Sequence, residues 1–533
     1  MFHAHCLLFA RVVGHALGHV LLVRTLALAQ QGQVCLICVC ACMNPQKKVY
    51  LTIHTLPHLG TLRVRARSET MSGFPIVHPL VGIALSEEQE LAMQKFAAGQ
   101  NVFVTGPGGT GKTKLIEHMC TMARATGKVV QVCALTGCAA SLLPATCEAR
   151  TVHSWSGIKL AKGPASKVVD SVVRRRTASP TWRKTKVLIV DEVSMMSCKI
   201  FDILDDIGRA TRKNPLMPFG GMQVVFLGDF FQLPPILDAG DEGGGGGGGG
   251  GQFCFESKRW THVFPKANHV ILKTIFRQSD PVYKSILMQI REGRLSSENA
   301  RILRSRVGIV FDAEAHHGVT PPKLFPTRIK TDMLNKTMYD RLVGEERVFL
   351  CDRKVDCTTY VENNKAIPLE VLETCRKLSL EERDAELQTL VSLPRIKLKV
   401  GSMVMCTVNY PHKGVCNGSQ GIVSGFDAGG FPVVKFSTGV MLPMGFHYTQ
   451  HEDYPMLAVG AIPLMLSWAM TIHKIQGATL AMAEIDVGGH IFECGQTYVA
   501  LSRVQSLEGL YLTAFEPSRI FVHEKVRQFY DGL

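Results

Sequence analysis

The first part of the chain lacks negative charge, because neither Asp nor Glu occurs before Glu69. Basic side chains do occur there, at Arg11, Arg24, Lys47, Lys48, Arg63, Arg65 and Arg67. An acid-poor, basic N-terminal segment is typical of organellar presequences. We therefore expect residues 1–80 to be a leader that directs the protein to the mitochondrion, with the nucleus as the alternative. A wrongly assigned start codon would leave a segment of similar composition.

This leader also lacks a clean signal peptide and an unbroken membrane-spanning run. Charged and amide residues interrupt its apolar stretches at Arg11, Arg24, Gln30 and Gln31. We therefore expect no stable membrane partner. The 17 cysteines of the chain lack the even, compact spacing of a secreted disulfide framework, which favours reduced thiols. Four of them cluster at Cys35, Cys38, Cys40 and Cys42, but a zinc site there would need a second pair or histidines at finger spacing.

Composition excludes a disordered chain and favours a polyanionic partner. The 533 residues are 46% hydrophobic, which is enough to bury a large core. Lys and Arg outnumber Asp and Glu by 59 to 45, giving a net charge of +14. Such a charge is typical of proteins that bind nucleic acid, although a solvated basic surface would have the same balance.

A phosphate-binding loop is the most specific feature of the sequence. Residues 106–113 have the sequence GPGGTGKT, which fits the pattern GxxxxGKT. An apolar run before it and a helical stretch after it give the required order of strand, loop and helix. The expected ligands are a nucleoside triphosphate and Mg²⁺, with the metal on the hydroxyl of Thr113. The expected contacts are Gly106, Pro107, Gly108, Gly109, Thr110, Gly111, Lys112 and Thr113.

Two further apolar runs end in polar residues that suit phosphoryl transfer. Residues 187–190 are followed by Asp191, a candidate Mg²⁺ ligand, and Glu192, a candidate base for the attacking water. Residues 223–227 are followed by the segment GDFFQLPP at 228–235, and we expect its Gln232 to contact the γ phosphate and sense its loss. The alternative for Gln232 is a plain strand-to-turn junction, stiffened by the two prolines that follow it.

Further motifs lie on both sides of this loop. In the first half they are LSEEQ at 85–89, TGCAA at 136–140, TVHSWSG at 151–157, SMM at 194–196 and PFGGMQ at 218–223. In the second half they are FRQ at 276–278, SWAMTIHKIQG at 467–477 and YVALSR at 498–503. Together they resemble the petite integration frequency family of DNA helicases, the eukaryotic branch of superfamily one that is related to bacterial RecD. The resemblance covers about residues 85–529.

The resemblance implies roles for residues around the nucleotide, which would be ATP. Gln89 would contact the adenine, and Gln476 and Gly477 would join the ATP contacts. Arg277 and Arg503 would reach the γ phosphate from a second domain, where planar guanidinium groups stabilise spread negative charge. The implied catalytic set is Lys112, Asp191, Glu192, Gln232, Arg277 and Arg503.

The resemblance also implies a path for single-stranded or forked DNA, bound by a monomer. The implied DNA contacts are Thr136, Ala139, His153, Ser154, His473 and Lys474. Trp155 is a candidate for stacking on bases. The alternative for His153, Trp155 and Trp468 is ordinary core packing.

We therefore expect an α/β fold with two RecA-like parallel-sheet motor domains and a small inserted β-barrel. The expected divisions are a leader at 1–80, a first motor domain at 81–242, a polyglycine loop at 243–251, a second motor domain at 252–340 and 462–533, and an inserted segment at 341–461. The expected activity is ATP-dependent 5′-to-3′ DNA unwinding in repair, recombination and telomere maintenance. The alternatives are a translocase that does not unwind and a nucleotide-gated DNA-binding subunit.

Overall fold

The structure is a computed structural model that divides into a unit at 1–83 and a unit at 84–533. It describes residues 24–30, 33–41, 47–55, 62–70, 85–159, 161, 163–175, 178–235, 252–311, 320–361, 364–390, 395–408, 410, 413, 415, 417–451 and 454–533. The expected polyglycine loop at 243–251 lies outside the described residues. No helix among the described residues is long and apolar enough to cross a membrane.

The N-terminal unit contains a four-stranded antiparallel sheet, in the order β1-β2-β3-β4. Its strands are β1 (Arg24–Gln30), β2 (Gln33–Ala41), β3 (Lys47–Thr55) and β4 (Leu62–Thr70). Apolar and polar residues alternate in the sequences of β3 and β4, a pattern typical of antiparallel strands. The leader prediction did not anticipate this sheet. Of the clustered cysteines, Cys42 lies outside the described residues.

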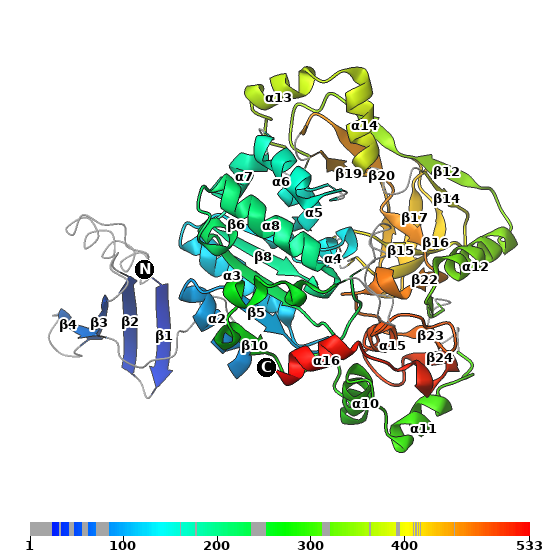
Figure 1. The fold of residues 1–533 in the computed structure, drawn as a ribbon, viewed down its shortest axis with the longest axis horizontal. Coiled ribbons are helices and arrows are strands. Elements are labelled where there is room, and N and C mark those ends of the chain that lie inside the picture. The colour runs from blue at the N-terminus through cyan, green and yellow to red at the C-terminus, as the bar shows by residue number, and fades with distance from the viewer. Residues whose placement is uncertain are drawn as a thin grey trace. The chain divides into compact units, whose positions relative to one another are not determined.

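A six-stranded parallel sheet forms the first motor domain, in the order β10-β5-β9-β8-β6-β7 (Figure 1). Its strands are β5 (Val102–Thr105), β6 (Val130–Ala134), β7 (Arg150–Thr151), β8 (Val187–Asp191), β9 (Gln223–Gly228) and β10 (His269–Ile271). The central strands β5, β8 and β9 are buried along their whole length. Burial on both faces explains why they are continuous apolar runs in the sequence.

Helices cover both faces of this sheet. They are α2 (Glu87–Ala97), α3 (Lys112–Ala125), α4 (Gly137–Leu142), α5 (Val152–Ser156), α6 (Ala165–Arg174), α7 (Ala178–Lys184) and α8 (Cys198–Thr211). Helices α2 and α3 pack with Val102 and Val104 on one face, while α5 to α8 pack with Phe103 on the other. The alternation of side chains along β5 thus separates two hydrophobic layers.

Two segments that the sequence assigned to the second motor domain belong to the first sheet and its core. One is the stretch with η4 (Cys254–Glu256), α9 (Trp260–Val263), η5 (Lys266–Asn268) and β10, which pairs in parallel with β5. The other is the C-terminal helix α16 (Glu524–Asp531). The rings of Trp260 and Phe529 lie 5.2 and 6.0 Å from the ring of Phe103. Aromatic packing, rather than position in the chain, therefore decides where these segments fold.

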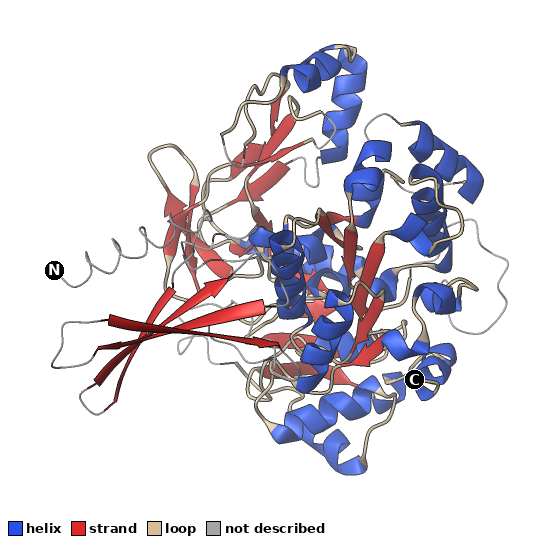
Figure 2. Ribbon diagram, turned by 90° about the vertical axis from the view of Figure 1, so that its left-hand side faces the viewer, coloured by secondary structure: helices blue, strands red, loops and turns tan. Residues whose placement is uncertain are grey.

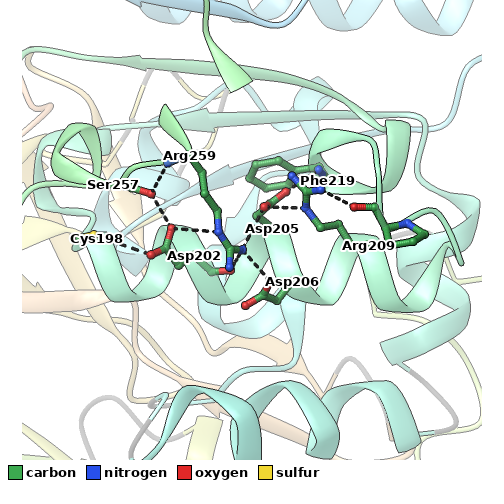
Figure 3. A network of polar contacts seen from close by, with 9 residues as sticks. Cys198, Asp202, Asp205, Asp206, Arg209, Phe219, Ser257 and Arg259 are labelled. Atoms are coloured by element: carbon green, nitrogen blue, oxygen red, sulfur yellow. Dashed lines mark hydrogen bonds and ion pairs between the residues drawn. The ribbon is translucent and has the colours of Figure 1, made fainter. Parts of the chain in front are cut away.

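A buried carboxylate stabilises the turn η3 (Pro218–Gly221) of the first domain, which lies in the motif PFGGMQ (Figure 3). Phe219 and Gly220 in this turn have φ angles of 49° and 63°. Asp205 of α8 accepts the N–H of Phe219 at 2.7 Å, and its other oxygen accepts Arg209 at 2.8 Å and Arg259 at 3.0 Å. The carboxylate thus satisfies a buried backbone donor in a conformation that a phenylalanine rarely adopts.

A four-stranded parallel sheet forms the second motor domain, in the order β22-β11-β23-β24. Its strands are β11 (Lys323–Phe325), β22 (Ala469–Thr471), β23 (Ala483–Val487) and β24 (Leu510–Phe515), and its helices are α10 (Pro281–Arg291), α11 (Ser297–Ser305), α12 (Arg328–Arg341) and α15 (Gln496–Leu501). Strand β11 pairs with both β22 and β23, which lie far along the chain. This domain is therefore discontinuous, as the sequence predicted.

The inserted segment contains helices and antiparallel strands (Figure 2). They are β12 (Arg347–Leu350), β13 (Asp352–Lys354), α13 (Leu369–Arg376), α14 (Leu380–Leu390), β14 (Arg395–Leu398), β15 (Met403–Cys406), β16 (Gln420–Phe426), β17 (Pro432–Phe436), β18 (Met441–Pro443), β19 (His447–Gln450), β20 (Ala458–Ala461) and β21 (Leu464–Leu466). The sheet orders are β12-β14, β13-β20-β19 and β18-β17-β16-β15-β21. In the described part of this segment β18 and β21 are the edges of the five-stranded sheet, so closure into a barrel stays a prediction. Strand β21 lies beyond the expected end of the insertion at residue 461, but it pairs with β15 and so belongs to the insertion and not to the motor domain.

Candidate nucleotide-binding site

The phosphate loop joins the end of β5 to the start of α3 and depends on glycine at two close approaches. Gly106 and Gly109 have φ angles of 150° and 86°. A Cβ atom would lie 2.4 Å from the carbonyl oxygen of Leu272 at Gly106, and 2.5 Å from the Cβ of Arg277 at Gly109. Only glycine fits there, so the loop can pack closely against these two residues while it leads into the N-terminus of α3, where anions bind.

Lys112 is the first residue of α3, and its ammonium folds back over the loop. Its Nζ donates to the carbonyl oxygens of Gly106 at 2.7 Å and Pro107 at 2.9 Å. Burial lowers the pKa of Lys112, while the carboxylates of Asp229 and Glu192 oppose that shift. The ammonium therefore lies beside the anion-binding amides, as the motif predicts.

Two buried acids lie at the end of β8, since Asp191 is its last residue and Glu192 follows it. Asp191 accepts the backbone N–H of Glu192 at 2.9 Å. Burial, together with repulsion from Glu192, raises the pKa of Asp191 to about 7. Glu192 has a φ angle of 54°, a strained conformation for a non-glycine residue. Backbone strain and a shifted carboxylate pKa are both typical of functional sites.

The second motor domain supplies two guanidinium groups to this site. Arg277 donates to the carbonyl oxygen of Ser502 at 3.1 Å, and Arg503 donates to its hydroxyl at 2.8 Å. A Cβ atom at Gly108 would lie 3.2 Å from Arg503 and 3.5 Å from Arg277. Burial and the charge of Arg503 lower the pKa of Arg277 to about 9, and burial also lowers that of Arg503. Both cations thus lie beside the phosphate loop, as expected for groups that stabilise phosphate charge.

Two glutamines complete the contact between the domains. Gln476 donates to Glu192 at 3.0 Å and to Ser194 at 3.4 Å. Gln232 is 3% exposed, and its Oε1 is buried without a hydrogen-bond partner in the structure. An unsatisfied buried amide oxygen is costly, typically about 1–3 kcal/mol, and therefore points to a ligand.

These groups surround one cavity of about 470 Å³. Its lining includes Gly108, Gly109, Gly111, Lys112, Thr113, Ala139, Asp191, Glu192, Gln232, Phe276, Arg277, Gly477 and Arg503. The cations and loop amides suit a polyphosphate. The Thr113 hydroxyl and the Asp191 carboxylate are the hard oxygen donors that Mg²⁺ prefers. The residues present therefore fit both expected ligands.

Comparisons with known proteins agree with this geometry. A family model described as PIF1-like helicase matches residues 84–301. ATP-dependent DNA helicase PIF1 of Homo sapiens is 33% identical over 454 residues, which cover 84% of this chain and 64% of that protein. A crystal structure of Pif1 helicase from Candida albicans is 30% identical, with a TM-score of 0.66, over 85% of this chain and 100% of that one. The chain belongs to the PIF1-like helicase family.

A second family member has the same two-sheet architecture. Pif1 from Bacteroides in complex with ADP-AlF4 is 26% identical with a TM-score of 0.61, over 85% of this chain and 97% of that one. The predicted α/β fold with two RecA-like parallel sheets is thereby confirmed. The chain spans 64% of the length of the human PIF1 protein.

At the expected adenine side of this PIF1-like site, the side chain of Gln89 is occupied by protein contacts. Its Nε2 donates to the carbonyl oxygen of Thr110 at 3.1 Å, and its Oε1 accepts the N–H of Ser86 at 3.0 Å. Phe276, to which sequence reasoning gave no role, is 57% exposed and lies 3.7 Å from where a Cβ of Gly111 would be. The motif FRQ alone did not indicate that the ring of Phe276 lines the cavity and is exposed.

Tyr498 is another contact that sequence reasoning missed, although it begins the PIF1-like motif YVALSR. Its hydroxyl oxygen accepts the backbone N–H of Gly108 in the phosphate loop at 2.9 Å. Burial raises the pKa of Tyr498 to about 12, so the phenol is neutral. The motif therefore touches the loop through a tyrosine as well as through Arg503.

The residues expected to contact DNA lie in different surroundings. The hydroxyl of Thr136 accepts the N–H of Ala139 as the cap of α4, and Ala139 is buried and lines the nucleotide cavity. Ser154 and Lys474 are exposed, while His153 and His473 are half-buried. The structure therefore places Ala139 toward the nucleotide instead of the surface.

The two tryptophans follow the core-packing alternative. Trp155 is 3% exposed and its ring lies 4.5 Å from that of Trp182, so the expected base stacking by Trp155 is wrong for this arrangement. Trp468 is buried beside Tyr339. Instead, Phe492 is 58% exposed, and its ring is inclined by 22° to the ring of His473 at 6.5 Å. Sequence reasoning did not identify this exposed aromatic side chain.

Proposed function

We propose that this chain is an ATP- and Mg²⁺-dependent DNA helicase that moves 5′ to 3′ on single-stranded DNA. The observation that carries the proposal is the cavity shared by both motor domains. Lys112, Asp191 and Glu192 face it from the first sheet, and Arg277 and Arg503 face it from the second. Phosphoryl transfer requires this combination of cationic and acidic groups.

Each residue has a task that its position supports. Lys112, Arg277 and Arg503 bind the β and γ phosphates, and Thr113 and Asp191 hold Mg²⁺, which offsets phosphate charge when bound. Glu192 accepts a proton from the attacking water and is oriented by its hydrogen bond to Gln476. The exposed ring of Phe276 covers the adenine. Hydrolysis at a site built from two domains is coupled to their relative motion.

The charge of the chain and the DNA complexes of related proteins support a DNA substrate. A net charge of +14 favours a polyanion. Related Bacteroides Pif1 structures are described as bound to single-stranded DNA, and another as two Pif1 helicases coordinating at forked duplex DNA. We propose binding to single-stranded and forked DNA, with one copy sufficient for movement and a second recruited at a fork.

The cellular setting belongs to the same proposal. The basic, acid-poor leader supports import into the mitochondrion, with the nucleus as the alternative. The proposed processes are DNA repair and recombination, with telomere maintenance in the nuclear alternative. Imaging a fusion of residues 1–80 tests this assignment, since diffuse or nuclear signal would contradict it.

Strand separation tests the activity. The substrates are duplexes with a 5′ or a 3′ single-stranded tail, mixed with ATP, Mg²⁺ and either wild type, Lys112→Ala or the exposed control Lys128→Ala. We expect unwinding of the 5′-tailed duplex by wild type and Lys128→Ala only. Hydrolysis without unwinding of either duplex would indicate a translocase, and absence of hydrolysis would indicate a binding subunit.

A further inference from the structure

A fully buried ion pair joins the two motor domains behind the nucleotide site. Asp229 follows β9 and is 0% exposed, and Arg291 ends α10 and is 7% exposed. Arg291 Nε lies 2.9 Å from one oxygen of Asp229, and its Nη2 lies 2.8 Å from the other. Burial alone would lower the pKa of Arg291, but Asp229 outweighs burial and raises it. The pair is therefore bidentate and charged.

The C-terminal helix encloses this pair. The guanidinium of Arg291 lies 4.4 Å from the ring centre of Phe231 and 5.3 Å from that of Tyr530. The rings of Phe231 and Tyr530 stack at 4.6 Å with an angle of 15° between them. Tyr530 of α16 and Phe231 of the first domain thus place two aromatic rings against a cation of the second domain.

The hydroxyl of Tyr530 connects the pair to the phosphate loop. It hydrogen-bonds to the hydroxyl of Thr105, the last residue of β5 before the loop, and accepts the N–H of Phe230 at 3.1 Å. It also lies 3.4 Å from Asp229. One phenol therefore contacts the end of β5 and the segment after β9.

The same segment carries Gln232, whose side-chain oxygen is buried without a partner in the structure. The N–H of Gln232 donates to the carbonyl oxygen of Asp229 at 2.9 Å. On the other side, a Cβ at Gly495 would lie 2.4 Å from the carbonyl oxygen of Phe231 and 2.7 Å from that of Gln232. The backbone at Gly495, just before α15, therefore packs closely against the turn at 229–232. A movement of Gln232 would require a movement of this backbone as well.

We propose that Arg291 and Tyr530 are positioning residues. They hold Gln232 where its side chain can contact the γ phosphate, and they transmit the presence of that phosphate to the second motor domain. This rests on the proposed function and assigns roles to residues outside the motifs. Neither side chain lines the nucleotide cavity. A buried ion pair is weak evidence for stability, since apolar replacements often stabilise a protein as well, so we assign this pair a geometric role.

Ligand discrimination tests the proposal. Affinities for ADP and for ADP with aluminium fluoride, each with Mg²⁺, are measured by calorimetry for wild type, Arg291→Lys and Tyr530→Phe. Both variants should bind ADP as tightly as wild type does. Their preference for ADP with aluminium fluoride over ADP alone should be about tenfold weaker. In steady state, kcat should fall by a similar factor while KM stays within about twofold. A purely structural role would lower thermal stability and change both affinities together.

Controls keep the outcomes distinct. Arg294→Lys changes an arginine that is 72% exposed just beyond α10, and Tyr511→Phe changes a tyrosine of β24, and both should behave like wild type. If Arg291→Lys fails to fold, Tyr530→Phe alone tests the proposal, because this variant keeps the stacked ring and removes only the hydroxyl. An unchanged preference in a folded variant, or a wild type that binds both ligands equally, overturns the proposal. A wild type that discriminates without hydrolysing ATP overturns the proposed function alone.

Discussion

Gln476 of the second motor domain donates a hydrogen bond of 3.0 Å to Glu192 of the first. Both side chains are buried, so the contact is shielded from bulk water. The orientation of the proposed base therefore depends on the position of the other domain. Domain closure and water activation are thus parts of one structural change.

Glu192→Gln should remove the general base while leaving nucleotide binding intact. We expect kcat for DNA-stimulated ATP hydrolysis to fall by about 10²–10⁴-fold. Gln476→Ala should cause a smaller loss, because the base stays but loses its orienting contact. The exposed Glu298→Gln is the control. Steady-state hydrolysis with measured ATP affinity checks this, and undiminished turnover by Glu192→Gln would disprove the assignment.

Removing the carboxylate of Asp205 should destabilise the turn at 218–221. The Asp205→Ala variant leaves the buried N–H of Phe219 without its acceptor, which costs about 1–3 kcal/mol. Asp206→Asn is the matched control, because Asp206 is 39% exposed and an exposed ion pair contributes only about 0–1 kcal/mol. Urea unfolding measures both. Equal stability of the two variants would contradict the role of Asp205.

The thiol of Cys198 should react slowly at neutral pH. Burial and the nearby carboxylate of Asp202 raise the pKa of Cys198 to about 11. A raised thiol pKa leaves little thiolate below that value, so alkylation should accelerate as the pH rises toward 11. Asp202→Asn should lower the pKa and speed alkylation at pH 8. Peptide-level mass spectrometry follows this site, and an alkylation rate that Asp202→Asn leaves unchanged would rule out the carboxylate as a cause of the shift.

Phe492 should stack on a base of single-stranded DNA, since its exposed ring lies beside His473 of the motif SWAMTIHKIQG. Loss of an aromatic stacking partner costs about 1–3 kcal/mol per base, so Phe492→Ala should weaken DNA binding by about tenfold or more. Phe492→Tyr should bind normally. Fluorescence anisotropy with a single-stranded oligonucleotide measures this. Leu216→Ala, at an exposed apolar residue of the first domain, controls for surface hydrophobicity.

Local patterns in the sequence were sufficient to predict the central site. The phosphate loop and the acids after β8 are contiguous motifs, and their roles depend on strand ends that periodicity reveals. Ala139 and Trp155 were misplaced because motif position does not say which face of a short helix meets the sheet. Tyr498 and Phe276 stood in recognised motifs, but their contacts depend on how the two domains face each other.

The domain boundaries and the buried pair needed the structure. Residues 252–272 follow the glycine run and were assigned to the next domain by position, whereas β10 pairs with β5. Asp229 and Arg291 belong to different predicted domains, and neither stands out from its neighbours in the sequence. Long-range pairing of this kind is set by packing in three dimensions, for which a single sequence has no local signal.

The position of α16 has a consequence for how the protein forms in the cell. Phe529 packs among the aromatic side chains of the first motor domain, although the whole second motor domain lies between them in the sequence. During synthesis the first sheet therefore emerges long before the helix that completes its core. Until then, apolar surface around Phe103 and Phe230 stays uncovered, which exposes the nascent chain to aggregation and to chaperones. The core of the first domain therefore lacks one of its aromatic side chains until the second domain has been synthesised.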